Sequence, residues 1–374
     1  MGGPLAIAGF LALILLVVIP IHELGHLLVA KRFGFKIQEY FVGFGPRLWS
    51  IKRGETEYGI KAIPAGGYVK IAGMNPYETV AAEDLARSYG SKPIWQRALV
   101  ILAGPLSHAL VGMLLYFTLF VTYGDPNTEL VIVGEVATTL DGAPSPALEA
   151  GLKVGDVVTR VGDLDRPTPD SLGHYVTRYA NEHPDEPLTY VIERDGRSLT
   201  LEIVPRLVTE DEITKGRIGF TLGSEQLSIP GSAVVAGEWV GRATANSAAT
   251  IPKVFTVGVG RTFSVLFTDE QRKSTDVVSL VGVSRQIGDA GERGDWGLFL
   301  GFAAYVTIFI GVVNLIPLPP LDGGHILLLL WEKITGRQAD YRKLVPVSAA
   351  VIVFLSIFAI ATVFLDITEP LPLI

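Results

Sequence analysis

Four long apolar blocks constrain this chain more than any other feature of its sequence. They run from about Pro4 to Ala30, from Ala98 to Val121, from Leu298 to Trp331 and from Leu344 to Leu365. Each is long enough for a helix that crosses about 30 Å of hydrocarbon, which takes ~20 apolar residues. Only 18% of the residues are charged and the mean hydropathy is +0.40, which is too apolar for an ordinary soluble enzyme. The sequence therefore predicts an α-helical polytopic membrane protein with four transmembrane helices.

Composition narrows the chemistry that is available to this chain. There is no cysteine, which excludes disulfides, thiolate metal ligands and a cysteine nucleophile. A transition metal would therefore need His, Asp or Glu ligands. The formal charge of -7 is modest and unclustered, so we expect no nucleic-acid partner. The first apolar block lacks a basic leader and a small-residue cleavage site, and we expect it to be a membrane span and not a cleaved signal peptide.

The short loops predict the orientation of the spans. Residues 31–97 hold eleven Lys or Arg against six acids, and residues 332–343 hold four against two, whereas no basic residue follows Leu365. By the positive-inside rule both loops are cytoplasmic, so both termini and residues 123–297 lie outside. The sixteen basic and twenty-six acidic residues of 123–297 agree, although long translocated segments respond weakly to charge.

A metal-binding pattern lies at the end of the first block, in His22-Glu23-Leu24-Gly25-His26. Residues four apart share one face of a helix, so His22 and His26 can present ring nitrogens to one ion with Glu23 beside it. In this HExxH arrangement the imidazoles bind Zn²⁺, which lowers the pKa of water to roughly 7, and the carboxylate accepts the proton. Ionisable groups inside an apolar span are costly, which favours a function over a satisfied polar cluster between helices.

A third ligand is expected from the third block, in the segment from Asn314 to Gly324. Its three prolines and two glycines cannot continue a regular helix, and broken backbone at membrane depth is tolerated only beside protein or a water-filled cavity. His22 lies nine residues before Lys31 and Asp322 ten residues before Glu332, so the two groups lie at similar depth. Asp322 is the predicted ligand, and His325 is a rival.

The second block carries Gly104-Pro105 and His108 at comparable depth, eleven residues or fewer from Arg97. Small residues allow helices to approach closely, which is the structural explanation for this segment. A histidine inside a span needs a further reason. We therefore predict that His108 contacts the substrate or the oxyanion.

Together these motifs resemble the site-2 protease family of intramembrane metalloproteases, in its bacterial sigma-E-regulating branch. The resemblance implies that zinc is bound by His22, His26 and Asp322, that Glu23 is the general base and that Asn314 holds the substrate backbone. His108 is a departure, because such proteins more often carry Asn there. The resemblance also implies a bacterial inner-membrane enzyme that cuts single-span proteins, such as anti-sigma factors or remnant signal peptides, after a first protease has trimmed them.

The cytoplasmic loop contains four short strand-like runs, at Lys36–Gly43, Arg47–Lys52, Glu57–Ile63 and Tyr68–Ile71. Gly43, Gly45-Pro46, Gly54 and Gly66-Gly67 are expected to form turns between them. The loop therefore predicts a small membrane-associated sheet beside the active site, similar to the re-entrant β-hairpin of the family. Its edge could pair with an extended substrate, or the sheet could be a structural lid.

The outer region predicts a small α+β domain at residues 128–208. Strands are expected at Val131–Val136, Leu188–Arg194 and Ser198–Val204, with a short helix at Ser145–Leu152 and a further strand after Lys153. The Ala150-Gly151-Leu152 and Gly155-Asp156 signature resembles a PDZ domain. Such a domain could bind a peptide by strand addition, or it could exclude substrates with large outer portions.

Residues 232–267 are weakly charged, but Pro252 and the interspersed charged residues predict interfacial or gate helices and not a fifth span. A fifth span would place Asp322 and His22 near opposite membrane faces. The expected organisation is a first span at 1–30, a cytoplasmic loop at 31–97, a second span at 98–122, the PDZ-like domain at 128–208, a gate region at 209–297, a broken third span at 298–331, a loop at 332–343 and a fourth span at 344–366.

Two other functions fit parts of the sequence. A non-catalytic receptor would sense exported peptides with the PDZ-like domain and hold a structural metal, and it would work without Glu23. A metal transporter is disfavoured because the four spans lack a chain of further ionisable groups beyond the site.

Overall fold

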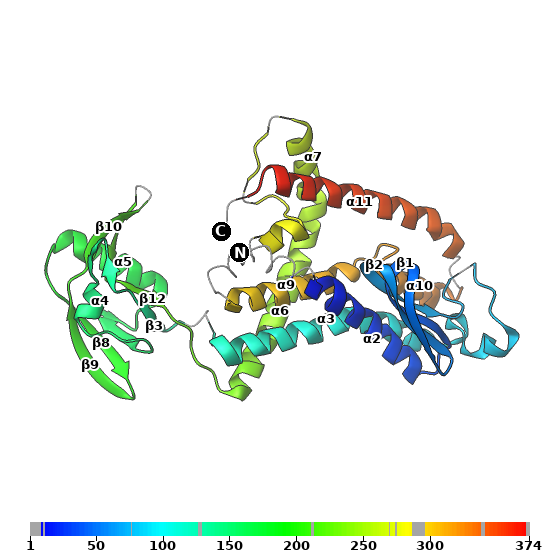
Figure 1. The fold of residues 1–374 in the computed structure, drawn as a ribbon, viewed down its shortest axis with the longest axis horizontal. Coiled ribbons are helices and arrows are strands. Elements are labelled where there is room, and N and C mark those ends of the chain that lie inside the picture. Colours follow the sequence, from blue (N-terminus) through cyan, green and yellow to red (C-terminus); the bar gives the residue numbers. More distant parts are fainter. Residues whose placement is uncertain are drawn as a thin grey trace. The chain divides into compact units, whose positions relative to one another are not determined.

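The computed structural model describes residues 9, 12–75, 77–125, 129–210, 213–268, 270–273, 275–285, 296–337 and 341–371. The chain divides into two compact units (Figure 1). The first unit comprises Met1–Leu119 and Ala236–Ile374, and the second comprises Phe120–Val235. Residues 1–8, 10 and 11, at the beginning of the first predicted span, lie outside the described residues.

Helices dominate the first unit, and some of them are long and apolar. The helical elements are η1 (Ile14–Val18), α2 (Ile19–Arg32), η2 (Ala82–Arg87), η3 (Tyr89–Ser91), α3 (Ile94–Tyr123), α6 (Ile229–Lys253), η4 (Val254–Gly258), α7 (Val259–Phe267), α9 (Trp296–Asn314), α10 (Asp322–Thr335), η5 (Tyr341–Leu344) and α11 (Val345–Thr368). Within the described ranges, three helices have the length and composition to cross a membrane: Ile94–Tyr123, Trp296–Asn314 and Arg342–Thr368. They correspond to the second block, the start of the third and the fourth.

The third apolar block is broken where its prolines predict. Helix α9 ends at Asn314, residues 315–321 form turns, and α10 begins at Asp322. Gly323 and Gly324 permit this tight path: a Cβ on Gly324 would lie 2.6 Å from the Pro319 nitrogen, and one on Gly323 would meet the carbonyl oxygens of residues 315 and 316. Asp322 therefore starts a short new helix at the end of an irregular segment.

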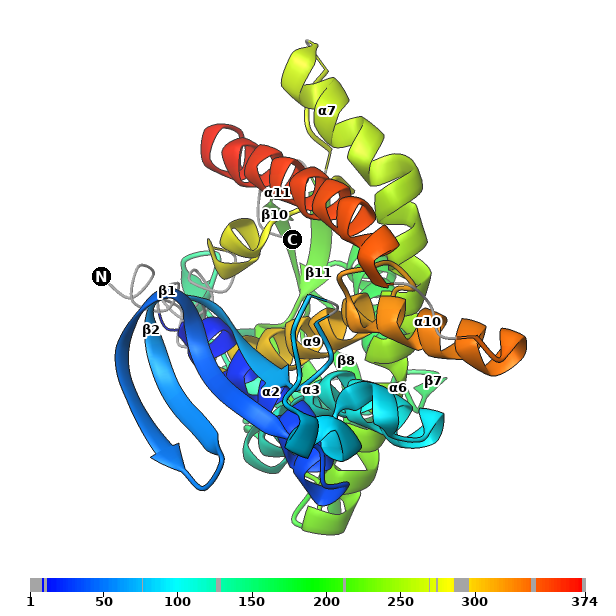
Figure 2. The ribbon, with the colours of Figure 1, turned by 90° about the vertical axis from the view of Figure 1, so that its right-hand side faces the viewer.

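The loop predicted between the first two spans forms a sheet from two long antiparallel strands, β1 (Ile37–Arg53) and β2 (Thr56–Ile71) (Figure 2). Residues 37–42 pair with 67–71, and residues 47–53 pair with 56–61. Residues 39–42 also lie beside 57–60, from Glu39 with Glu57 to Val42 with Ile60. The hairpin thus folds back on itself and sets four short segments side by side, in the order 67–71, 37–42, 56–61 and 47–53.

The four predicted strand-like runs are confirmed by these pairings, but most of the predicted turns are wrong. The chain reverses at Gly54, whereas Gly43, Gly45 and Gly66 lie within the continuous strands, with φ of 87°, 82° and 136°. These positive φ values are accessible to glycine, so a strand can bend there without ending. The glycines therefore mark bends that fold the hairpin back.

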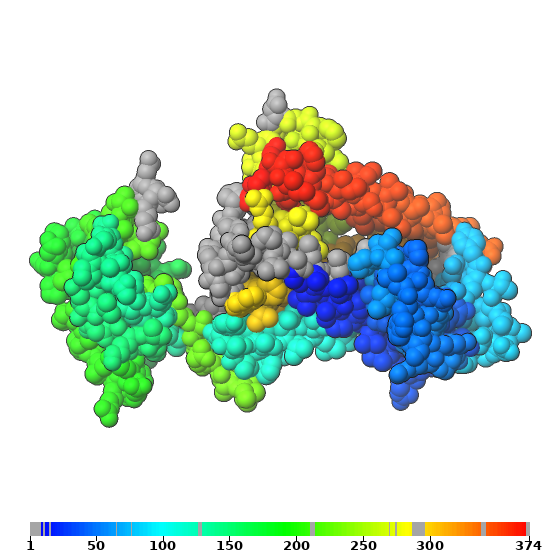
Figure 3. Space-filling view, in the orientation of Figure 1, coloured from blue at the N-terminus to red at the C-terminus, as the bar shows by residue number. Residues whose placement is uncertain are grey.

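A buried cluster joins α2, the base of the hairpin and α3. Its members are Leu27, Ala30, Phe35, Ile37, Ile71, Tyr89, Val100 and Ile101. Helix α11 is much less covered by other parts of the protein. Only 6% of its most apolar 18-residue stretch is buried (Figure 3, red). An apolar helix with an open surface of this kind is suited to contact with lipid.

The helices predicted within residues 232–267 are present in the structure. Helices α6 and α7 are joined without interruption through the π-helical turn η4, from Ile229 to Phe267. Pro252 lies inside α6 directly before that turn. This segment is not among the three helices with the composition of a span. Its role as a gate stays a prediction.

The second unit is built around an antiparallel sheet in the order β12-β3-β6-β8-β9, with β7 against β6. Its strands and helices are β3 (Val131–Val136), β4 (Thr139–Leu140), β5 (Ala143–Pro144), α4 (Pro146–Glu149), β6 (Val157–Val161), β7 (Leu164–Asp165), α5 (Pro169–Glu182), β8 (Leu188–Arg194), β9 (Arg197–Ile203), β10 (Arg206–Glu210), β11 (Ile213–Arg217) and β12 (Phe220–Leu222). The strands predicted at 131–136 and 188–194 have the predicted bounds. Strand β12 pairs with β3, so the sheet extends beyond residue 208.

Candidate metal centre

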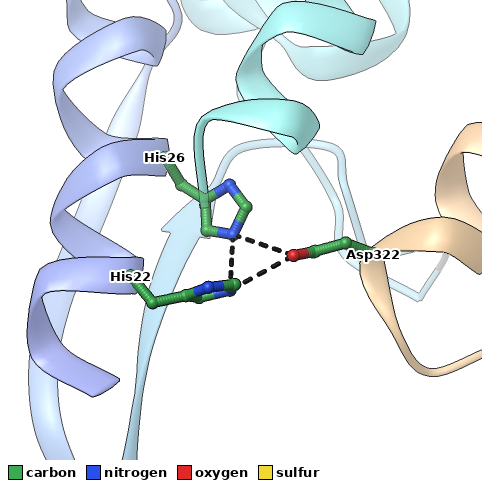
Figure 4. Close-up of side chains that lie close together, drawn as sticks. All are labelled: His22, His26 and Asp322. Atoms are coloured by element: carbon green, nitrogen blue, oxygen red, sulfur yellow. Dashed lines mark hydrogen bonds and ion pairs between the residues drawn. The ribbon is translucent and has the colours of Figure 1, made fainter. Parts of the chain in front are cut away.

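Helix α2 brings two histidine rings together on one face (Figure 4). The Nε2 atoms of His22 and His26 are 3.1 Å apart, and the ring centroids are 4.7 Å apart at an interplanar angle of 84°. Both residues are buried. The i, i+4 spacing on a helix places the two side chains one above the other, as the sequence predicts.

Asp322 reaches the same point from the first turn of α10 (Figure 4). Its Oδ2 atom lies 3.2 Å from His22 Nε2 and 3.5 Å from His26 Nε2. The three residues form a group whose potential ligand atoms all lie within 4.8 Å of one another. Two segments nearly 300 positions apart in the sequence therefore converge on one small volume, in agreement with the depth argument from the sequence.

The spacing of these donors fits a zinc ion. Donors at about 2.0–2.2 Å from zinc, in a tetrahedral arrangement, would be separated from one another by about 3.3–3.6 Å. The observed separations are 3.1, 3.2 and 3.5 Å. Two neutral imidazoles and one carboxylate are also a typical ligand set for catalytic zinc, which leaves one coordination position open. The residues present can therefore hold the metal.

Helix α3 passes so close to the histidines that a side chain is not tolerated there. A Cβ on Gly104 would lie 2.7 Å from His22 Cε1 and would collide with the His26 ring. On the opposite helix, a Cβ on Gly25 would collide with the carbonyl oxygen of Ala103 and lie 3.3 Å from the Ser107 side chain. Glycine on both helices permits this close approach, as small residues do where membrane helices pack together.

The main chain of α3 also orients one of the rings. His26 Nδ1 lies 2.8 Å from the carbonyl oxygen of Val100. A ring nitrogen that donates to a carbonyl leaves Nε2 unprotonated, which is the state required of a metal ligand. His22 Nδ1 is buried and has no hydrogen-bond partner among the described residues.

Glu23 lines a cavity of about 740 Å³, and the three potential metal ligands line the same cavity. The cavity is lined by residues of α2, β1, β2, α3, α9 and α10, including Gly67, Tyr68 and Val69 of β2, and by Met74, which follows β2. Gly67 brings the edge segment 67–71 against the carboxylate, because a Cβ there would lie 3.2 Å from Glu23 Cγ. Val69 of the same segment also lines the cavity. A strand edge thus lies beside the predicted base.

Asn314, His108 and His325 all line this cavity. Asn314 is the last residue of α9. The His108 ring centroid is 4.9 Å from that of His22, and neither of its buried ring nitrogens has a hydrogen-bond partner in the described part of the chain. His325 follows Asp322 by one helical turn and does not belong to the group of three close donors. The cavity therefore contains every site residue that the sequence predicts.

Two contributors to the site were not predicted from the sequence. The Val100 carbonyl carries no side-chain signal, because any residue at that position presents the same group. The sequence predicts for Gly104 only the role of a small residue in helix packing, although it borders the rings of His22 and His26 directly. The adjacent Pro105, which lies inside α3, is the sequence signal that could have indicated a functional role for this segment.

Comparison with known proteins shows similarity over almost the whole chain. Residues 10–358 match the sequence profile of peptidase family M50. Zinc metalloprotease Rip1 of Mycobacterium tuberculosis is 32% identical over 403 aligned positions, covering 97% of this chain and 97% of that protein. Regulator of sigma-W protease RasP of Bacillus subtilis is 26% identical, with 93% of each covered. Metalloprotease MmpA of Caulobacter vibrioides is 28% identical, with 87% of this chain and 86% of that protein covered.

Proposed function

This chain belongs to peptidase family M50 and is a zinc metalloendopeptidase, and on that premise we propose that it hydrolyses peptide bonds within the transmembrane segments of single-span membrane proteins. The observation that carries the proposal is the convergence of His22, His26 and Asp322 from two apolar segments on one cavity. A hydrolytic site among membrane helices has access to substrates that are themselves in the membrane.

His22, His26 and Asp322 are the proposed zinc ligands. When bound, zinc supplies Lewis acidity, which makes water nucleophilic near neutral pH and polarises a carbonyl group. Val100 contributes by holding the His26 ring in the orientation and tautomer that a ligand needs.

Glu23 is the proposed general base. Its carboxylate accepts a proton from the water as the water oxygen forms a bond to the scissile carbonyl carbon. Glu23 then donates that proton to the leaving nitrogen as the C–N bond breaks. The position of Glu23 on the cavity wall, next to His22 in the chain, supports both roles.

Asn314 and His108 are proposed to hold the substrate. An amide side chain donates and accepts, so Asn314 can hydrogen-bond to the substrate backbone. His108 has two buried ring nitrogens without a described partner, and a ring N–H can donate to the oxygen that gains negative charge during the attack. These assignments rest on the shared cavity lining.

The edge segment 67–71 is proposed to pair with an extended stretch of substrate. A helical backbone hides its carbonyls from a nucleophile, whereas strand addition exposes them at a fixed register. The segment is one of the two outer segments in the sheet order derived from the pairings, and it lines the cavity beside Glu23.

We further propose four spans in a bacterial plasma membrane, with both termini and the second unit outside and the hairpin sheet on the cytoplasmic side. The bias of Lys and Arg in the short loops supports this orientation. The second unit is proposed to be a PDZ-like peptide-binding domain, because among its described strands β12 is at one end of the sheet and Leu222 on that strand is 52% exposed. The proposed partners are therefore the lipid bilayer, a transmembrane substrate and a peptide.

The test of the mechanism is a Glu23→Gln variant of the full chain, purified in detergent and assayed on a panel of single-span membrane proteins. We expect full zinc content and loss of cleavage by at least 10²-fold, the lower end of a general-base effect. Glu83→Gln is the matched control, because Glu83 is an exposed carboxylate that does not line the cavity. Undiminished cleavage by Glu23→Gln would contradict the proposed mechanism.

A further inference from the structure

One face of α3 contacts both halves of the proposed metal centre. The Val100 carbonyl holds His26 at 2.8 Å. Three residues earlier, the Arg97 guanidinium makes a bidentate ion pair with Glu332 of α10, at 2.9 Å from Nη1 to Oε2 and 2.7 Å from Nη2 to Oε1. Residues three apart lie on the same face of a helix. The same stretch of α3 is therefore attached to the helix of the histidines and to the helix of the aspartate.

Helix α10 depends on such an attachment, because it is short and follows broken backbone. Its first residue is Asp322, and Glu332 lies ten residues later, about 15 Å along the helix. A groove of about 580 Å³ lies between this helix and α3, lined by Trp95 and Ala98 of α3 and by Ile326 and Leu330 of α10, among others. The apolar contact between the two helices is therefore incomplete along this length.

The ion pair is buried and directional. The Arg97 side chain is 4% exposed and that of Glu332 is 12% exposed. Arg97 is itself held in place, since its Nε donates to the Lys92 carbonyl at 3.0 Å and its guanidinium lies 5.7 Å from the centre of the Tyr89 ring. A bidentate pair of planar groups specifies orientation as well as distance, which an apolar contact does not.

We propose that Arg97 and Glu332 are positioning residues for the metal centre: by fixing α10 against α3, they set the place of the Asp322 carboxylate relative to His22 and His26. The proposal rests on the assignment of Asp322 as a zinc ligand. Neither Arg97 nor Glu332 lines the cavity, so both act through the helix and not on the substrate.

The test replaces the pair by apolar side chains of similar size, as Arg97→Met/Glu332→Leu. Removing both charges together avoids leaving one of them buried and unpaired, so the fold is retained. The protein is loaded with Co²⁺ for its visible absorption spectrum, and with Zn²⁺ for its rate of release to a chelator. We expect an altered cobalt spectrum and zinc release faster by about 10-fold or more, the range known for outer contacts that orient metal ligands.

A matched control is available in Arg272→Met/Asp366→Leu. This ion pair is also buried, with side-chain exposures of 4% for Arg272 and 3% for Asp366. It joins the segment after α7 to α11 and does not involve α10. The control should keep the parental spectrum and release rate. An equal loss in the control would overturn the proposal, because the effect would then be one of general stability.

Two further outcomes separate this proposal from the function that it rests on. If Asp322→Ala retains zinc as the parent does, the proposed ligand set is wrong. If Asp322→Ala loses zinc while Arg97→Met/Glu332→Leu keeps the parental spectrum and release rate, only the positioning role is overturned. Should the apolar pair fail to yield a monodisperse protein, Arg97→Lys is measured in its place, since it keeps the charge but loses the bidentate geometry.

Discussion

Gly104 makes the proposed metal centre possible by lacking a side chain. The helix that carries it runs against the two histidine rings, and a single methyl group would lie within 2.7 Å of His22. We expect Gly104→Ala to push the rings apart or to displace α3, and so to lower the zinc content of the purified protein by at least 10-fold, with cleavage lost in proportion. Elemental analysis of the full chain measures the zinc content directly.

The same substitution elsewhere supplies the control for Gly104→Ala. Gly237 is helical, and an added Cβ would meet nothing within 4 Å. Alanine there should leave zinc content unchanged and stabilise α6 by about 0.5–1 kcal/mol, because glycine is costly inside a helix. A Gly104→Ala protein with one zinc per chain would show that the rings have room to move and that the close approach is not required.

Residue types at the metal centre are predictable from the sequence, whereas their surroundings are not. His22, Glu23 and His26 form a local pattern, and Asp322 follows from a broken span at matching depth. The Val100 carbonyl and the Arg97–Glu332 pair depend on how α3 packs against α2 and α10. Such contacts join residues as far apart as 235 positions, and helical periodicity contains no information about them.

At the scale of elements, the sequence predicts where strands lie better than how they connect. Each of the four strand-like runs in residues 31–97 is in the sheet, yet Gly43 and Gly66 are bends and not turns. Glycine at positive φ occurs both in bends within a strand and in turns between strands. Which of the two forms depends on the strand that pairs with the segment. Helix α5 was not predicted, although Thr168 and Ser171 form a capping box at its start.

Within the second unit, a buried ion pair links the turn before β6 to β8. Arg194 donates from Nε to Asp156 Oδ1 and from Nη2 to Oδ2, each at 2.6 Å, and the Lys153 amide donates to Oδ2 at 2.8 Å. Burial acts to raise the pKa of the Asp156 carboxyl, but these hydrogen bonds outweigh it and hold the pKa below the ordinary value of 3.8. The carboxylate thus stabilises the fold while it is charged.

This pKa shift predicts an acid-dependent loss of stability in the second unit. Because the folded pKa lies below the unfolded one, the stabilisation is complete above pH 3.8 and is lost as the pH falls through the folded pKa. At pH 7, Asp156→Asn should cost about 2 kcal/mol, less than the ~3–5 kcal/mol of a fully buried pair because the Arg194 side chain keeps 22% exposure. As the pH falls through the folded pKa, the difference between the variant and the parent should shrink.

Hydrogen exchange of β6 and β8 peptides in the full chain measures this difference. Variant and parent are compared at the same pH, so the intrinsic pH dependence of exchange cancels. Asp163→Asn is the control, since Asp163 is exposed in the same unit and should leave protection unchanged. A variant as well protected as the parent at pH 7 would refute a stabilising role of the pair.

At the scale of the whole molecule, the long helix from Ile229 to Phe267 decides the topology. At 1.5 Å per residue it is about 58 Å long, more than enough to cross a membrane. Were it a span, the third apolar block would run in the opposite direction, and Asp322 would lie near the other face from His22. The separation of 3.2 Å between their side chains favours a helix that stays outside the hydrocarbon.

The absence of cysteine from the sequence allows a direct test of the whole topology, because every single-cysteine variant has a silent background. Ser198→Cys reports on the second unit, Gln271→Cys on the segment after α7, and Glu83→Cys on the loop before α3; all three positions are exposed. With a membrane-impermeant maleimide on intact spheroplasts, we expect labelling at positions 198 and 271, and labelling at position 83 only after permeabilisation. The proposed orientation requires this pattern, since the basic loops remain in the cytoplasm. If Gln271→Cys behaved like Glu83→Cys instead, the helix from Ile229 would cross the membrane, and the four-span arrangement would have to be abandoned.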